Sequence, residues 1–299
     1  MAAGALAVVL GATVAGCGTP TATVATISYC PPGGPARELD LYTPSPAPTG
    51  PVPAVVYVHG GGWVAGSQTL SPFIALIEHR VIAAGDVFVS VNYRLAPGNR
   101  WPAQIEDVTC AVRFLRHQAK DLDIDPARIA ALGDSAGGQL VSLLGLAGPG
   151  AGFDAGPYPG VSSAVDAVAD LYGPADLTAP DWAGDTAMGV FADATFGQPF
   201  GRATAELAAA SPVTYVSRRA PPFLIVQGAD DTIVPAGQSR ELARRLTAAG
   251  AHATLVLVAH AGHGLIPEGG HAISPDTAQL SGRIAAFLLG AAPVSSPRR

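Results

Sequence analysis

The segment Gly133–Gly137, which reads Gly-Asp-Ser-Ala-Gly, constrains the fold of this chain more than any other feature. An apolar run at residues 129–132 precedes it, and a second apolar run at residues 138–144 follows it. A serine between glycines, after a strand and before a helix, is typical of the sharp turn called a nucleophile elbow. The helix would direct its first amide N–H groups to the place where negative charge develops. We therefore expect a strained turn at Ser135; the alternative is a glycine-rich turn with an incidental serine.

Strands and helices alternate from residue 53 onward, as they do in parallel β-α-β units. The expected strands cover residues 54–58, 87–92, 129–132, 164–171, 223–227 and 253–258. The expected helices cover residues 72–84, 103–119, 137–145, 237–249 and 277–289. Residues 24–29 and 37–42 resemble a leading antiparallel hairpin. The sequence therefore predicts an α/β fold with a central, mostly parallel sheet of eight strands flanked by helices.

A serine hydroxyl needs a base that takes its proton and a group that holds this base. Two later loops, each directly after an expected strand, supply an acid and a histidine. Asp230 and Asp231 are adjacent and cannot both point inward, and the pattern Gly-x-x-Asp-x-x-Val-Pro favours Asp231. His263 is favoured over His260 because the glycines on both sides would allow a close approach to the serine. The sequence thus predicts Ser135, Asp231 and His263 as a triad in the order Ser, Asp, His.

A glycine-rich loop, His-Gly-Gly-Gly-Trp at residues 59–63, follows the first strand of the alternating pattern. Residues without side chains let backbone N–H groups approach a substrate oxygen and donate to it. We expect the N–H groups of Gly61, Gly62 and Ala136 to form an oxyanion hole. Trp63 is the candidate for the substrate pocket because it belongs to the same loop. As an isolated string, three glycines would be only a flexible loop.

Four motifs in this order resemble the α/β-hydrolase superfamily: residues 59–63, 91–97, 133–138 and 171–174. The resemblance covers roughly residues 25–290 and is closest to the esterase/lipase group, which includes hormone-sensitive-lipase-like and feruloyl-esterase-like carboxylesterases. Hormone-sensitive-lipase-like members usually carry a segment of the type Asp-Pro-Leu-x-Asp at the acid. The segment around Asp231 is nearer to the feruloyl-esterase-like and dienelactone-hydrolase-like pattern.

The resemblance implies the α/β-hydrolase fold and a serine carboxylesterase that hydrolyses short-to-medium acyl esters. Its partner would be a small-molecule ester, with no metal and no organic cofactor. An amidase or arylformamidase is the alternative, because the same triad and glycine loop occur in such relatives. A non-catalytic binding protein on the same scaffold, or a lipase with a long amphipathic lid, is less favoured. We interpret Arg94, in the second motif, as an anchor between loops rather than a substrate ligand.

We assign residues 27–292 to one α/β-hydrolase domain, with a small cap candidate at residues 176–210 and a flexible tail at residues 293–299. In the cap candidate, Trp182, Met188, Phe191 and Phe196 would line an acyl or alcohol pocket or form the core of the cap.

The chain has 299 residues, 13% of them charged, and a formal net charge of −6. No basic cluster occurs, so nucleic acid is excluded as an expected partner. Two of the three cysteines, Cys30 and Cys110, could pair in an oxidising compartment or remain separate buried thiols. Neither has a metal-ligand spacing to a histidine, so we expect no metal site. The sequence does not predict the oligomeric state.

The N-terminal residues 1–16 are uncharged and mostly small and apolar, like the apolar region of an export signal. They end in Val-Ala-Gly before Cys17, a sequence that resembles a bacterial lipobox, although no Lys or Arg precedes the run. We therefore expect a signal peptide at residues 1–17 and a tether at residues 18–26. The protein would be an exported lipoprotein anchored to the membrane through lipid on Cys17. A secreted soluble protein, or a cytoplasmic protein with a disordered leader, is the alternative.

Overall fold

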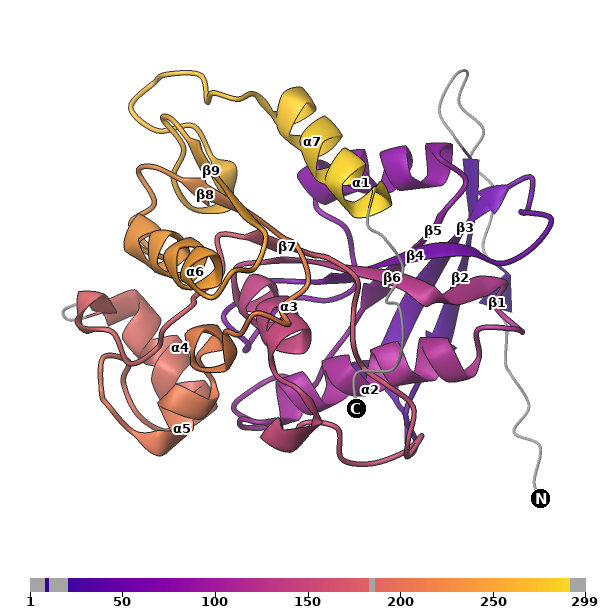
Figure 1. Ribbon diagram of the computed structural model, residues 1–299, viewed down its shortest axis with the longest axis horizontal. Coiled ribbons are helices and arrows are strands. Elements are labelled where there is room, and N and C mark those ends of the chain that lie inside the picture. The colour runs from indigo at the N-terminus through magenta and orange to yellow at the C-terminus, as the bar shows by residue number, and fades with distance from the viewer. Residues whose placement is uncertain (1–8, 11–20, 183–185, 291–299) are drawn as a thin grey trace.

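One mixed sheet runs through the protein in the computed structural model, which describes residues 9–10, 21–182 and 186–290 (Figure 1). Its strands lie in the order β1-β2-β3-β5-β4-β6-β7-β8-β9. The eight main strands are β2 (Thr21–Ser28), β3 (Glu38–Ser45), β4 (Val52–Val58), β5 (Val87–Val91), β6 (Ile124–Asp134), β7 (Val168–Leu171), β8 (Phe223–Gly228) and β9 (Ala253–Val258). A two-residue strand, β1 (Val9–Leu10), pairs with β2 at the edge.

The strands from β5 to β9 in this order are parallel to their neighbours, whereas β2 and β3 form an antiparallel hairpin beside them. Every residue of β5 and of β8 is buried, because helices cover both faces of a parallel sheet. The predicted eight-stranded, mostly parallel sheet is therefore confirmed, with β1 as an additional edge strand.

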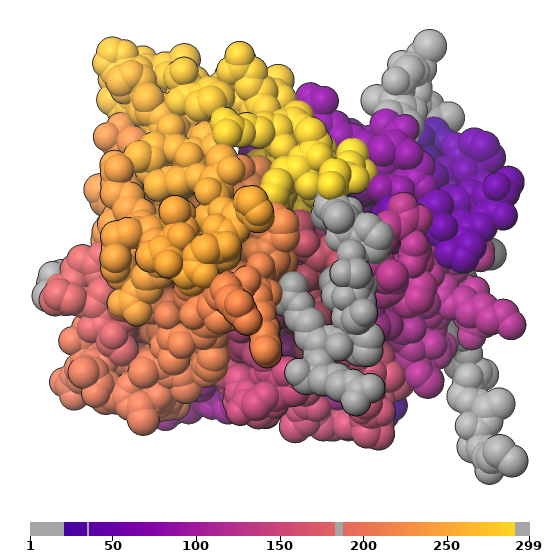
Figure 2. All heavy atoms as spheres, viewed as in Figure 1, coloured from indigo at the N-terminus to yellow at the C-terminus, as the bar shows by residue number. Residues whose placement is uncertain are grey.

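The helices divide between the two faces of the sheet (Figure 1). The helices α1 (Pro72–Ala83) and α7 (Thr277–Leu289) cover one face, and α2 (Ala103–His117), α3 (Ala136–Leu146) and α6 (Ala236–Ala248) cover the other. Two separate hydrophobic clusters, one for each face, fill the space between helices and strands. In Figure 2 the N-terminal segments and the C-terminal third of the chain occupy opposite sides of the view, as the strand order requires.

The cap candidate at residues 176–210 contains a 3-10 turn (Pro180–Trp182) and the helices α4 (Thr186–Phe196) and α5 (Ala205–Ala209). Trp182 and Phe196 are buried and pack around the ring of Phe200. The rings of Phe196 and Phe200 in turn meet Trp63 edge-on, at centroid distances of 5.5 and 5.9 Å. These contacts join the cap to the glycine-rich loop.

The predicted tether at residues 18–26 is wrong for its second part, because β2 begins at Thr21. Thr21 pairs with Ser45 of β3, and the β-branched residues of this segment favour a strand. The strand predicted at residues 164–171 is also shorter, since β7 begins at Val168. Cys17 and the tail at residues 293–299 lie outside the described residues.

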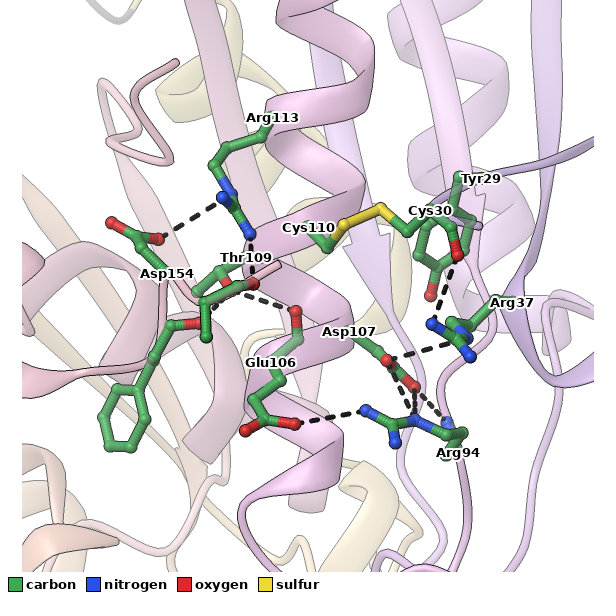
Figure 3. The surroundings of a disulfide bond; sticks show 12 residues. Tyr29, Cys30, Arg37, Arg94, Glu106, Asp107, Thr109, Cys110, Arg113 and Asp154 are labelled. Atoms are coloured by element: carbon green, nitrogen blue, oxygen red, sulfur yellow. Dashed lines mark hydrogen bonds and ion pairs between the residues drawn. A yellow bond between two sulfur atoms is a disulfide. The ribbon is translucent and has the colours of Figure 1, made fainter. Parts of the chain in front are cut away.

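A disulfide joins Cys30, just after β2, to Cys110 in the middle of α2, with 6.2 Å between the Cα atoms (Figure 3). One turn earlier on α2, the carboxylate of Asp107 accepts hydrogen bonds from the backbone and guanidinium of Arg94, with a shortest distance of 2.8 Å. Arg37 lies on the other side of this carboxylate, at 4.0 Å. Arg94 is therefore an anchor, as the sequence predicts, but it joins the loop after β5 to α2 and not to another loop.

In the part of the chain that the structure describes, no helix combines the length and the apolar character that a membrane crossing needs.

Candidate active site

The chain turns sharply between β6 and α3, at Ser135, with φ 52° and ψ −120°. This positive φ is strained for a serine and occurs where the surrounding structure enforces it. The glycines on both sides are required by space: a Cβ on Gly133 would lie 2.3 Å from the carbonyl oxygen of Gly137. A Cβ on Gly137 would lie 2.0 Å from the carbonyl oxygen of Val58 in β4. The predicted elbow is present, and Ser135 stands at the carboxyl end of the central strand.

Two hydrogen bonds connect Ser135, His263 and Asp231 in series. The Nε2 atom of His263 lies 2.9 Å from Oγ of Ser135, and its Nδ1 atom lies 2.8 Å from Oδ2 of Asp231. With Nδ1–H donating to the carboxylate, Nε2 is left to accept the serine proton. Asp230 is exposed, and His260 lies on the surface, where its ring meets His271 at 4.9 Å. The structure thus brings together the three residues that the sequence favours.

The carboxylate of Asp231 is buried and fully hydrogen-bonded. Its Oδ1 accepts from the backbone N–H groups of Ile233 and Val234, both at 2.9 Å. Its Oδ2 accepts from Nε2 of Gln227 at 2.9 Å as well as from the histidine. The side-chain oxygen of Gln227 in turn accepts from Ser239 of α6 at 2.7 Å. These donors hold the carboxylate in place and fix its direction towards His263.

The glycine-rich loop after β4 has left-handed backbone conformations at Gly61 (φ 110°), Gly62 (φ 60°) and Trp63 (φ 63°). The loop forms a tight turn, since a Cβ on Gly61 would lie 2.2 Å from the carbonyl oxygen of Ala65. Ala65 donates its N–H to the carbonyl oxygen of Gly61 at 3.0 Å. The loop therefore has a defined shape and is not a flexible string of glycines.

Asp134, directly before the serine, links the elbow to this loop. Its Oδ1 accepts from the hydroxyl of Tyr57 at 2.7 Å and from the N–H of Gly60 at 3.1 Å. Burial raises the pKa of the Asp134 carboxyl, and the bonds from Tyr57 and Gly60 oppose that rise. The side chain of one residue thus sets the distance between the elbow and the glycine-rich loop.

His59 and the segment after β5 also hold the glycine-rich loop in place. The hydroxyl of Tyr93 donates to the carbonyl oxygen of His59 at 3.0 Å, and the two rings stack with centroids 4.3 Å apart. Burial lowers the pKa of His59 to about 4, so its ring is neutral near neutral pH. Ala96 donates its N–H to the carbonyl oxygen of Trp63 at 2.9 Å.

A cavity of about 430 Å³ opens above Ser135, between the glycine-rich loop and the cap. Its side-chain walls beyond the triad are mainly apolar and come from Pro174, Met188, Phe191 and Ile233, with Tyr172 beside His263. Among the described residues that line this cavity, none is a lysine or an arginine.

Trp63 is one of the lining residues, yet it is fully buried. Its indole N–H donates to Oε1 of Gln139 at 3.0 Å, and its ring packs on the cap. Of the cap side chains singled out in the sequence, Met188 and Phe191 line the cavity, whereas Trp182 and Phe196 belong to the cap core.

No group of three or more His, Cys, Asp or Glu side chains that could hold a metal ion occurs within residues 9–10, 21–182 and 186–290.

The sequence pattern of the BD-FAE family matches residues 39–246, which cover the glycine-rich loop, Ser135 and Asp231. The chain belongs to the BD-FAE family.

Several esterases are similar to this chain. This BD-FAE chain is 35% identical to esterase LipC of Mycobacterium tuberculosis over 217 residues, which are 72% of this chain and 53% of LipC. Among solved structures, a truncated carbohydrate esterase from gut microbiota has a TM-score of 0.73 and 27% identity, over 88% of this chain and 94% of that one. The propionate-bound esterase Est2 of Thermogutta terrifontis has a TM-score of 0.66 and 25% identity, over 86% and 92%. The chain spans about half the length of the curated relatives it matches.

Two functional side chains of this BD-FAE protein were missed from the sequence, Asp134 and Gln227. Both are polar residues that closely follow an apolar run at the carboxyl end of a strand. A polar side chain at the carboxyl end of a buried parallel strand is a signal that could have identified them, since sites gather at this edge.

Proposed function

We propose that this BD-FAE protein is a serine carboxylesterase that hydrolyses uncharged esters with short-to-medium acyl chains. The observation that carries the proposal is the series of hydrogen bonds from Asp231 through His263 to Ser135, at 2.8 and 2.9 Å. A base that is oriented by a carboxylate and touches a strained serine is the arrangement that activates a hydroxyl for acyl transfer.

In the proposed reaction, Oγ of Ser135 attacks the ester carbonyl carbon while Nε2 of His263 takes the serine proton. The carbonyl oxygen becomes an oxyanion that accepts hydrogen bonds from the N–H groups of Gly61, Gly62 and Ala136. The N–H of Ala136 belongs to the first turn of α3 and is therefore one of the donors that a helix leaves without a partner in the helix. His263 then gives its proton to the leaving alcohol, and water releases the acyl group by the reverse steps.

The walls of the cavity support uncharged, apolar substrates. Pro174, Met188, Phe191 and Ile233 offer hydrophobic contacts and no charge that would bind a carboxylate or phosphate. The bound propionate in the similar Est2 structure is the acid part of a short acyl ester, which supports the same size of acyl group here.

The decisive experiment compares the wild type with Ser135→Ala on p-nitrophenyl butyrate and with a fluorophosphonate probe. We expect the variant to lose turnover and labelling while its circular dichroism spectrum and melting temperature stay the same. Near-normal turnover in the variant would overturn the proposal. Faster turnover of formanilides than of esters by the wild type would favour the arylformamidase alternative.

We also propose that the protein is exported and carries lipid on Cys17. The uncharged apolar run at residues 1–16 before Cys17 supports this. The Cys30–Cys110 disulfide supports it as well, because disulfides persist in oxidising compartments. Mass spectrometry of the N-terminal peptide from a bacterial expression host, with Cys17→Ser as control, tests the proposal. An unmodified cysteine in a soluble cytoplasmic fraction would contradict it.

A further inference from the structure

The cap helix α4 places one aromatic ring directly on the glycine-rich loop. A Cβ on Gly62 would lie 2.7 Å from Cγ and 2.9 Å from Cδ1 of Phe191. These distances mean that the ring of Phe191 covers the Cα atom of Gly62, where only a glycine leaves it room. Met188, one turn earlier on α4, lines the same cavity and is almost fully buried. The two side chains form one wall of the cavity beside the proposed oxyanion donors.

This wall is fixed by the C-terminal part of α4. The ring of Phe196 lies 5.5 Å from both Trp63 and Trp101 between centroids. The carbonyl oxygen of Thr195 accepts the N–H of Trp101 at 3.1 Å, and Ala192 is fully buried. Because α4 is anchored in this way, it holds the Phe191 ring in one place, and the ring can limit the space in the cavity.

The chemistry of the proposed reaction divides the cavity into two sides. His263 has to give its proton to the leaving alcohol, so the alcohol part lies on the side of His263, near Gly264 and Ile233. The oxyanion lies at the donors of the glycine-rich loop. The acyl chain, which is attached to the same carbon, has to leave in a third direction, and the wall of Met188 and Phe191 against the glycine-rich loop is a part of the lining that is available to it.

We propose that Phe191 determines the acyl specificity of this enzyme, because its ring on Gly62 closes the acyl side of the cavity and limits the length of chain that fits. This inference rests on the proposed esterase function. Long acyl chains are excluded by the ring, whereas the alcohol part does not meet it.

The test measures kcat/KM for p-nitrophenyl acetate, butyrate, hexanoate, octanoate and decanoate in the wild type, Phe191→Ala and Val190→Ala. Val190 is the matched control, since it neighbours Phe191 on α4 but is 67% exposed. We expect Phe191→Ala to raise the ratio of kcat/KM for octanoate over butyrate about tenfold, the size of a small apolar difference in a pocket. Val190→Ala should leave this ratio unchanged.

An alcohol series, with butyrate esters of methanol, ethanol and butanol, separates the two sides of the cavity. We expect Phe191→Ala to leave the preference in this series unchanged. An unchanged acyl ratio in Phe191→Ala, an equal shift in Val190→Ala, or a shift in the alcohol series alone would each overturn the inference.

If Phe191→Ala fails to fold, Phe191→Leu takes its place. We expect Phe191→Leu to raise the ratio of kcat/KM for octanoate over butyrate by a smaller factor, and an unchanged ratio would overturn the inference. Failure of the proposed function itself looks different: the wild type would then turn over none of these esters, and the fluorophosphonate probe would not label Ser135.

Discussion

On one half of the candidate site, around Ser135, close backbone contacts hold the chain, whereas on the other half, around Asp231 and His263, a carboxylate with hydrogen bonds to both oxygens holds it in addition to such contacts. On the first half, β4, β6 and α3 approach so closely that Gly133 and Gly137 leave no room for a Cβ. On the second half, Gly228 at the end of β8 also leaves no room for a Cβ beside Ala261 and Gly262, and the loops after β8 and β9 are joined further through polar atoms of Asp231 and its donors.

We therefore expect the two halves of the site to tolerate different kinds of mutation. The elbow half should lose its shape when any atom is added to Gly133 or Gly137, because backbone carbonyl groups occupy the space around these glycines. Away from Gly228 and Gly262, the acid–histidine half should accept changes of shape at neighbouring positions but lose activity when one hydrogen-bonding atom is replaced. Variants chosen in matched pairs can test each half separately.

The largest effect is expected for Asp231→Asn, with Asp230→Asn as the matched control. An amide in place of the carboxylate would no longer hold the imidazole in the productive tautomer, which in a comparable triad costs about 10⁴ in kcat. Asp230 is exposed, so its variant should keep wild-type activity. Steady-state kinetics on p-nitrophenyl butyrate measures both. Equal losses in the two variants, or high activity in Asp231→Asn, would contradict the assignment of the acid.

A smaller loss is expected for Gly137→Ala on the elbow half. The new Cβ would lie 2.0 Å from the carbonyl oxygen of Val58, so β4 and the glycine-rich loop after it have to move. We expect kcat to fall about 10²–10³-fold, as after the loss of one oxyanion donor. Overpacking should also lower the free energy of unfolding by about 1–3 kcal/mol.

Gly148→Ala is the control for this variant, because its Cβ would meet open space and its φ is −75°. It should keep full activity and unfold at the same or a slightly higher urea concentration. Full activity in Gly137→Ala would show that steric closeness is not what holds the elbow half.

The sequence predicts the elbow half and the triad for a physical reason that lies in local order. Gly-Asp-Ser-Ala-Gly between two apolar runs leaves the chain few alternatives, and the loops with Asp231 and His263 each follow a strand whose apolar run is plain. The choice of Asp231 over its neighbour also came from a local pattern. Local motifs at strand ends are therefore readable without a structure, and the sheet brings the side chains of these motifs together across 32 and 128 residues.

The partners of Asp134 and the contact of Phe191 with Gly62 could not be read in this way. Tyr57 and Gly60 are 77 and 74 residues away from Asp134, and they reach it only because β4 and β6 pair with Val58 opposite Gly133. The register of two parallel strands is set by the packing of the whole sheet. Likewise, the contact between Phe191 and Gly62 depends on how the cap folds back over the sheet, which no local pattern encodes.

The smallest effect is expected for Tyr57→Phe, which tests whether the elbow half depends on hydrogen bonds as well as on close contact. The variant removes the hydroxyl that donates to Asp134 at 2.7 Å and keeps the buried ring. We expect a loss of about 1 kcal/mol in transition-state stabilisation, or roughly fivefold in kcat/KM, through a loosened link between Asp134 and the glycine-rich loop. Asp134→Ala should cost more, since the hydroxyl of Tyr57 and the N–H of Gly60 would then both lose their acceptor.

A double-mutant cycle decides how the link works. If Tyr57 acts through Asp134, the losses in Tyr57→Phe and Asp134→Ala will not add in the double variant. Additive losses would mean that the hydroxyl of Tyr57 supports the site by another route, and the elbow half would then depend on close backbone contact alone. Non-additive losses would instead show that both halves use hydrogen-bonded carboxylates. Asp134 would then align the glycine-rich loop as Asp231 aligns the histidine.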